Sequence, residues 1–229
     1  MAEIVLALDL RSVDDARRLL DRLPDLRWVK IGPVLLTPAG APFVQELARR
    51  RLEVFLDLKW HDIPNTVAGA VEAARELGVS MVTVHTLGGR SMLEHAARAA
   101  GDALAVVGVT VLTAHDAASY GLALERGRVD LAAEVTRLAG EARRAGLAGV
   151  VCSPHEIEAV RSVLGPEALI VVPGIRAPGE ASGDQVRVST AGDAAARGAT
   201  HLVVGRPILQ APDPGAMLRA LSAEAACAS

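Results

Sequence analysis

Eight short runs of aliphatic and β-branched residues recur along the chain, and segments with helical spacing of apolar residues lie between them. Strand-like runs that alternate with helical patterns indicate βαβ units and a parallel sheet. The strands are expected at residues 4–10, 28–32, 53–59, 81–86, 105–112, 149–153, 169–175 and 201–206. Helices are expected between them, for example at residues 13–23, 42–51, 66–77, 131–145 and 156–164.

Eight such repeats within 229 residues favour a closed barrel over an open doubly wound sheet. An open sheet of that kind more often stops at about five or six strands. Glycines fall at the junctions between the predicted elements, and no linker rich in Ser, Gly and Pro divides the chain. We therefore predict an α/β fold with a single domain over residues 1–229, a (β/α)8 TIM-type barrel.

The composition restricts both the core and the partners. Hydrophobic residues make up 51% of the chain but aromatic residues only 2%, so aliphatic side chains must fill the interior. A formal net charge of −3 without a long basic run argues against a nucleic-acid partner, which would require clustered Lys and Arg. The N-terminus lacks the pattern of a signal peptide, and the longest apolar stretch, residues 103–112, is far shorter than the about 20 residues that span a bilayer. We expect no membrane association.

The two cysteines, Cys152 and Cys227, have no metal-ligand spacing and do not form a disulfide framework. Free thiols fit a reducing compartment. We therefore expect a cytoplasmic protein.

Charged residues stand at the end of the third predicted strand. Side chains alternate between the two faces of a strand, so Asp57 and Lys59 share a face with Phe55. The opposite face, which includes Leu56 and Leu58, is wholly apolar and is expected to face the surrounding helices. Asp57 and Lys59 should therefore point into the barrel at its carboxyl end, where active sites of this fold lie.

The same alternation directs Asp9 and Lys30 into the barrel, which brings four charges to one region. A salt-bridge network that only closes the barrel is the alternative, but buried charges cost free energy to desolvate and apolar replacements are often as stable. Fixed charges at a cavity mouth more often perform chemistry. Asp62 follows in a loop or first helical turn, where Asp62 or Asn65 could instead cap a helix, and alternation does not orient it.

The segment DLKWHDIPNT, residues 57–66, resembles the signature of the orotidine 5′-phosphate decarboxylases of bacterial type. Other segments are similar to that family in order and spacing, namely ALDL, VKIGPVLL, VTVLTAHD, VVCSPHE, VVPGIR with the later GDQ, and LVVGRPI. The resemblance extends over residues 4–215. It implies a lyase without metal or organic cofactor that converts orotidine 5′-monophosphate to uridine 5′-monophosphate in de novo pyrimidine biosynthesis.

The resemblance also implies roles for individual residues. Lys59 would be the catalytic acid, and Lys30, Asp57 and Asp62 would complete an alternating charged array. Asp62 would reach into the neighbouring site of a homodimer. The substrate-binding residues implied by the family are Asp9 and Lys30 at the ribose, Thr113 near the pyrimidine, Ile63 and Thr66 beside Asp62 at the shared site, and Arg176, Gln185, Gly205 and Arg206 at the 5′-phosphate or its closing loop.

The polar segment 176–189 follows the seventh predicted strand, where loops of this fold often bind phosphate. An ordinary exposed loop is the alternative. Two positions depart from the common family pattern: Trp60 stands where phenylalanine is frequent, and Ala114 where serine is frequent. Trp60 is expected to point outward and to affect packing, whereas Ala114 leaves the contacts to the pyrimidine open.

The sequence leaves two other functions and one other kind of site as alternatives. A related group of sugar-phosphate decarboxylases and aldolases uses Mg²⁺ and carries a glutamate where this chain has Lys30, and a cation there would repel the metal. A nucleotide-binding barrel without activity is the second alternative, but it would have no reason to keep charges that repel a ligand carboxylate. His61 and His85 could form a metal site with the nearby aspartates, although hydrogen-bonded histidines are the simpler interpretation.

Overall fold

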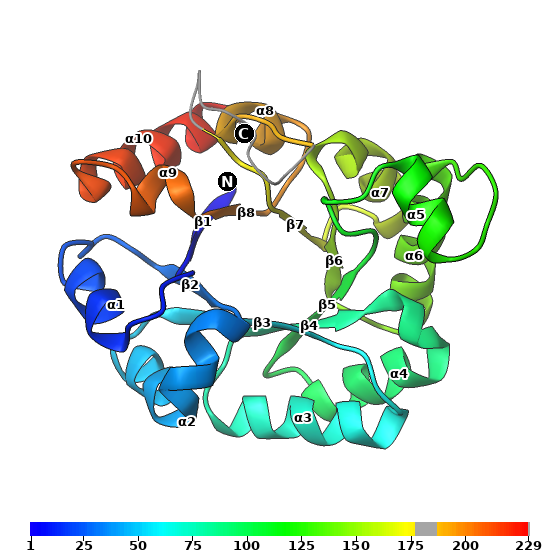
Figure 1. Cartoon of the computed structure of the whole chain (residues 1–229), viewed down its shortest axis with the longest axis horizontal. Coiled ribbons are helices and arrows are strands. Elements are labelled where there is room, and N and C mark those ends of the chain that lie inside the picture. The colour runs from blue at the N-terminus through cyan, green and yellow to red at the C-terminus, as the bar shows by residue number, and fades with distance from the viewer. Residues whose placement is uncertain (177–186, 229) are drawn as a thin grey trace.

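Eight parallel strands close into a barrel in the computed structural model, which describes residues 1–176 and 187–228. Figure 1 shows the ring of strands and the helices outside it. The strands are β1 (Glu3–Ala7), β2 (Trp28–Ile31), β3 (Glu53–Trp60), β4 (Met81–His85), β5 (Ala105–Val109), β6 (Gly149–Val151), β7 (Leu169–Val172) and β8 (His201–Val204). Each strand pairs with the next, and β1 pairs with β8, so the (β/α)8 prediction is confirmed.

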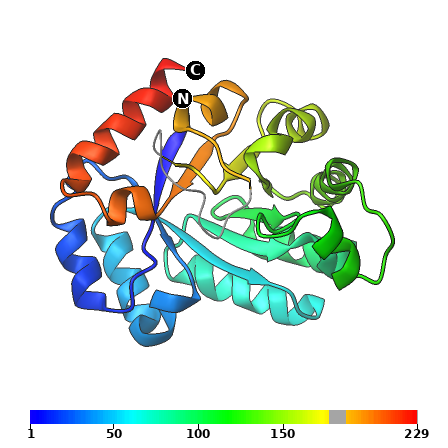
Figure 2. The same ribbon diagram turned by 45° about the horizontal axis from the view of Figure 1, so that its top comes forward.

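Helices cover the outside of the barrel. They are α1 (Val13–Leu20), α2 (Pro33–Arg49), α3 (Pro64–Glu76), α4 (Gly89–Ala100), α5 (Ala117–Ala123), α6 (Leu131–Arg144), α7 (Ile157–Leu164), α8 (Ala191–Ala196), α9 (Arg206–Leu209) and α10 (Pro214–Cys227), with short 3-10 turns at Thr86–Gly88 and Pro154–Glu156. Helix α10 contacts β1 and α8, so the last helix of the chain lies against its first strand (Figure 2). No helix within the described ranges combines the length and apolarity that a bilayer crossing requires.

Several of the predicted boundaries were wrong. The expected strands 4–10 and 105–112 run past the observed ends at Ala7 and Val109. Beyond those ends each chain segment keeps one backbone hydrogen bond to its neighbour, from Leu8 and from Thr110, and the apolar residues that follow line the mouth of the barrel. Helix α2 begins at Pro33, nine residues before the predicted start at residue 42. Its two halves meet at Gly40, whose φ of 62° is non-helical, and the prolines on either side concealed the first half in the sequence.

The interior of the barrel and the layer under the helices form two separate apolar clusters. Inside the barrel, the side chains that pack together are Val5, Ala7, Phe55, Met81, Val107, Val171 and Val203. The outward residues of the same strands, including Leu56 and Val84, belong to the larger cluster against the helices. Trp60 packs against that outer cluster, as alternation predicted. Burying each large aliphatic side chain stabilises the fold by roughly 1.5–3 kcal/mol relative to leaving it exposed. The two clusters therefore make the barrel a packed scaffold.

Side-chain caps fix where several helices begin. Ser12, Asp130 and Asp213 each accept a hydrogen bond from a backbone N–H in the first turn of α1, α6 and α10. Helix α3 is different, because its first residue is Pro64 and its N-cap is Ile63, with no side-chain cap bond. The alternative that Asp62 or Asn65 caps this helix is therefore wrong.

Candidate active site

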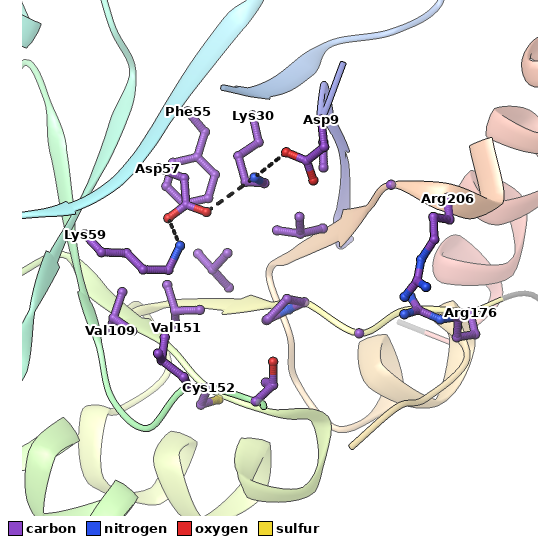
Figure 3. Close-up of a pocket in the computed structure, with 18 of the residues that line it drawn as sticks. Asp9, Lys30, Phe55, Asp57, Lys59, Val109, Val151, Cys152, Arg176 and Arg206 are labelled. Atoms are coloured by element: carbon purple, nitrogen blue, oxygen red, sulfur yellow. Dashed lines mark hydrogen bonds and ion pairs between the residues drawn. The ribbon is translucent and has the colours of Figure 1, made fainter. Parts of the chain in front are cut away.

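A cavity of about 550 Å³ opens at the carboxyl end of the strands. Its lining includes Asp9, Lys30, Asp57 and Lys59 from β1, β2 and β3 and the segments that follow them. Figure 3 shows these four side chains on one side of the cavity and Arg176 and Arg206 on the other. The rest of the lining includes apolar side chains such as Val109 and Val151, as well as Thr113 and Gly174. The cavity thus has an end with both acidic and basic side chains, a cationic end, and apolar side chains in the rest of its lining.

Asp9, Lys30, Asp57 and Lys59 form a chain of alternating charge. The Lys30 ammonium lies 3.4 Å from a carboxylate oxygen of Asp9 and 3.4 Å from Oδ2 of Asp57. The Lys59 ammonium lies 2.8 Å from Oδ1 of Asp57. The side chains of Lys30 and Asp57 are 11% and 13% exposed, whereas that of Lys59 is 37% exposed. Asp57 is therefore buried, whereas the Lys59 ammonium that contacts it is accessible from the open part of the cavity.

The Asp57 carboxylate is ionised despite its burial. Burial alone raises the pKa of this carboxyl, but the ammonium groups of Lys30 and Lys59 and hydrogen bonds from Lys59 and Thr83 outweigh that effect. The net result is a pKa below the ordinary value of an aspartate. Asp57 thus holds a fixed negative charge between two cations at neutral pH.

Strand β3 is irregular where it carries Lys59. Its pairing with β4 shifts register between Leu56 and Trp60, and the backbone of Lys59 has a φ of 51°. A left-handed backbone at a residue with a side chain costs roughly 1–3 kcal/mol and is frequent at functional sites. The Lys59 N–H donates a hydrogen bond of 2.8 Å to the hydroxyl of Thr83 on β4.

Arg176 and Arg206 form the cationic end of the cavity. Arg176 is buried and donates a hydrogen bond to the carbonyl of Ile175, at the point where β7 leads into the following loop. Arg206 is exposed and begins α9 directly after Gly205 and the end of β8. Two guanidinium groups at the ends of β7 and β8 suit an anionic group of a ligand.

Several residues named from the sequence lie elsewhere. Asp62, Ile63 and Thr66 are exposed on the rim and do not belong to the described lining of the cavity. The Asp62 carboxylate accepts a hydrogen bond of 2.7 Å from the N–H of Ile63, whose side chain is 67% exposed. Gln185 lies outside the described residues. The structure therefore brings together eight of the twelve named residues: Asp9, Lys30, Asp57, Lys59, Thr113, Arg176, Gly205 and Arg206.

A buried ion pair behind the cavity was not foreseen from the sequence. The guanidinium of Arg187 pairs with the Glu156 carboxylate and also donates a hydrogen bond to the carbonyl of Leu112. Glu156 in turn accepts a hydrogen bond of 2.9 Å from the Ser153 N–H. The loops after β5, β6 and β7 are thus joined at one point.

The rings of His61 and His85 stack with their centroids 5.5 Å apart. Burial, together with the smaller effects of the neighbouring His61 and Lys59, lowers the pKa of His85 to about 4. His85 is therefore neutral at pH 7, and its ring nitrogen accepts a hydrogen bond from the N–H of Leu87. Among the residues that the structure describes, no cluster of three or more His, Cys, Asp or Glu is arranged to bind a metal ion.

Comparisons with known proteins agree on one family. Residues 2–221 match the model of the family described as orotidine 5′-phosphate decarboxylase / HUMPS. The chain is 50% identical to the orotidine 5′-phosphate decarboxylase of Halorhodospira halophila over 98% of this chain and 96% of that protein. It is 45% identical to that of Moorella thermoacetica over 97% and 91% of the two chains. The crystal structure of the Lactobacillus acidophilus orotidine 5′-phosphate decarboxylase is similar, with a TM-score of 0.86, 34% identity and coverage of 98% and 99%.

Proposed function

The chain belongs to the orotidine 5′-phosphate decarboxylase / HUMPS family, and from this premise we propose that it converts orotidine 5′-monophosphate to uridine 5′-monophosphate in pyrimidine biosynthesis, without a cofactor. The observation that carries the proposal is the alternating array inside the barrel mouth, with the Lys59 ammonium 2.8 Å from Asp57 and directed at the cavity. The cytoplasm is the proposed compartment, in keeping with the free thiols of Cys152 and Cys227.

Lys59 supplies positive charge and then a proton. When the bond between C6 of the pyrimidine and its carboxyl group breaks, CO2 leaves and the electron pair stays on C6 in the plane of the ring. No adjacent carbonyl delocalises that pair, so a nearby cation must stabilise it. The ammonium of Lys59 then donates its proton to C6 as a general acid, and the amine recovers a proton from solvent.

Asp57 has two effects in this mechanism. Its carboxylate would lie beside the carboxylate of the substrate, and the repulsion between the two charges would be relieved as CO2 departs. It also holds the Lys59 ammonium through a direct hydrogen bond. The low pKa of Asp57 supports both effects, because each requires the ionised form at neutral pH.

The remaining residues would bind the parts of the substrate that do not react. Asp9 and Lys30 would hold the ribose, and Thr113 would lie near the pyrimidine. Arg206, Gly205 and Arg176 would bind the 5′-phosphate side, together with Gln185, which lies outside the described residues. Phosphate binding far from C6 can drive closure over the substrate and exclude water, which strengthens the charges around C6.

The charge of Lys30 argues against the metal-dependent alternative. Its ammonium lies between the carboxylates of Asp9 and Asp57, the groups that would otherwise attract a divalent cation. A second cation in the same place would be repelled.

Loss of orotidine 5′-monophosphate absorbance, followed with purified protein, tests the function. We expect turnover that is unchanged by EDTA. Turnover that EDTA abolishes would favour the metal enzyme. No turnover combined with tight binding of uridine 5′-monophosphate would favour a nucleotide-binding barrel without activity.

We further propose that the active form is a homodimer in which Asp62 completes the neighbouring site, with Ile63 and Thr66 beside it. All three are exposed on the rim and outside the cavity of their own chain. An isoleucine that is 67% exposed suits a position that a second subunit covers. A two-fold interface would supply Asp62 to both sites at once.

Mixing inactive Lys59→Ala and Asp62→Ala subunits tests the shared site. In a hybrid dimer, one site carries both substitutions and the other carries neither, so random exchange should restore about a quarter of the wild-type activity. A mixture of Lys59→Ala with Asp57→Ala is the matched control, because each hybrid site then lacks one of the two residues and no activity should return. If mass spectrometry shows hybrid dimers but the first mixture stays inactive, Asp62 does not act across the interface.

A further inference from the structure

Thr83 is fully buried in the middle of β4 and contacts both members of the Asp57–Lys59 pair. Its hydroxyl oxygen accepts the N–H of Lys59 at 2.8 Å and lies 3.0 Å from Oδ1 of Asp57. A threonine hydroxyl has a single proton. Because the Lys59 N–H is a donor, that proton is available for the Asp57 carboxylate. One hydroxyl therefore joins the backbone of Lys59 to the carboxylate that holds its ammonium.

The position of Thr83 matters because β3 is irregular there. The register shift between Leu56 and Trp60 turns the Lys59 N–H toward the side chain of Thr83. The left-handed backbone at Lys59 is costly unless the surrounding structure holds it. The Thr83 hydroxyl is one of the contacts that hold this conformation, and through it the direction in which the Lys59 side chain leaves the strand.

Thr83 does not contact the ligand space directly. The described lining of the cavity includes Asp57 and Lys59 but not Thr83. Any effect of its hydroxyl on the reaction must therefore pass through those two residues.

We propose that Thr83 is a positioning residue for the decarboxylation. Its hydroxyl fixes the backbone of Lys59 and one oxygen of Asp57, so that the ammonium faces the carbon that loses CO2. This inference rests on the function proposed above, and its test distinguishes the two.

The first measurement compares Thr83→Val with Thr83→Ser. Valine is close to threonine in shape but lacks the hydroxyl, so kcat should fall roughly 10- to 100-fold, as expected for a lost hydrogen bond to a charged group. KM should change less than about threefold, because Thr83 does not line the cavity. Serine keeps the hydroxyl and should hold kcat within about threefold of the wild type.

Thr86→Val is the matched control. Thr86 is equally buried just beyond the end of β4, but its hydroxyl donates to the backbone carbonyl of Val109 and not to a carboxylate. Its kcat should be unchanged. A Thr83→Val enzyme as active as Thr83→Ser, or an equal loss in Thr86→Val, would overturn the inference while the proposed function stands. If Thr83→Val does not fold, Thr83→Ala takes its place in the same comparison.

The second measurement does not depend on activity. Hydrogen exchange of the Lys59 backbone amide, followed by NMR, should be roughly tenfold faster in Thr83→Val than in the wild type and unchanged in Thr83→Ser. If the Lys59 amide exchanges as slowly in Thr83→Val as in the wild type, the hydrogen bond between this amide and the Thr83 hydroxyl is refuted. If the wild type does not decarboxylate orotidine 5′-monophosphate, the proposed function fails, and faster exchange would then show only that Thr83 positions Lys59.

Discussion

Replacing Lys59 with alanine should reduce kcat for orotidine 5′-monophosphate by about four orders of magnitude or more. The substitution removes the proton donor and the cation next to the forming carbanion, and each contributes roughly 10²-fold or more to catalysis. Binding of uridine 5′-monophosphate should weaken only modestly, because the product has no carboxylate or carbanion at C6. Absorbance assays and titration calorimetry measure the two quantities.

Lys59→Arg separates charge from proton transfer. Arginine keeps the positive charge but does not give up a proton under these conditions, so most of the loss should remain. Arg27→Ala, which removes an exposed cation from the Glu3–Arg27 pair at the other end of the barrel, is the control for a change in net charge and should leave kcat unaltered. A kcat for Lys59→Ala within tenfold of the wild type would remove Lys59 from the role of acid.

Arg187→Met should cost the fold about 3–5 kcal/mol of free energy of unfolding, because it leaves the Glu156 carboxylate buried without its partner. Both side chains are less than a tenth exposed. For a chain of this size, such a loss lowers Tm by roughly 6–20 °C. Urea and thermal unfolding measure the change.

The double substitution Arg187→Met with Glu156→Gln should recover part of that stability. No unpaired charge then remains, and the glutamine can still accept the hydrogen bond from the Ser153 N–H. Arg27→Met is the matched control, since its ion pair with Glu3 is 2.7 Å long but exposed and should contribute about 0–1 kcal/mol. A loss in Arg187→Met no larger than in Arg27→Met would mean that the buried pair does not hold the loops together.

The barrel could be predicted because its signal is periodic. Eight aliphatic runs separated by helical patterns specify the strand count, and alternation along residues 53–59 assigned the apolar face of β3 to the helices. The ends of the strands could not be predicted, because apolar residues also line the mouth. The first half of helix α2 was missed, because residues typical of turns interrupt its sequence around Gly40 although the segment is helical on both sides.

The candidate site also consists of residues that could be predicted from the sequence and residues that could not. Asp9, Lys30, Asp57 and Lys59 were found because charge on an apolar strand is conspicuous. Thr83 and the Arg187–Glu156 pair were not found. The contacts of Thr83 depend on the register between β3 and β4, and the Arg187–Glu156 pair depends on how the loops meet once the barrel has closed. Alternation along residues 81–86 would have directed Thr83 inward beside Met81, but the sequence does not record the shift that brings it to Lys59. Asp62, Ile63, Thr66 and Gln185 stay predictions that depend on the family resemblance.

The two lysines of the charged array also allow the cavity to be observed selectively, by isotope labelling and by amine-reactive reagents. Lys30 and Lys59 are the only lysines in the 229-residue sequence, so every other fixed side-chain cation is an arginine. A sample labelled with ¹³C and ¹⁵N in lysine alone would give two side-chain amine resonances, both from the cavity. Reagents that attack amines, including common fluorescent dyes and immobilisation resins, would modify side chains only inside that cavity, and a bound nucleotide should protect them.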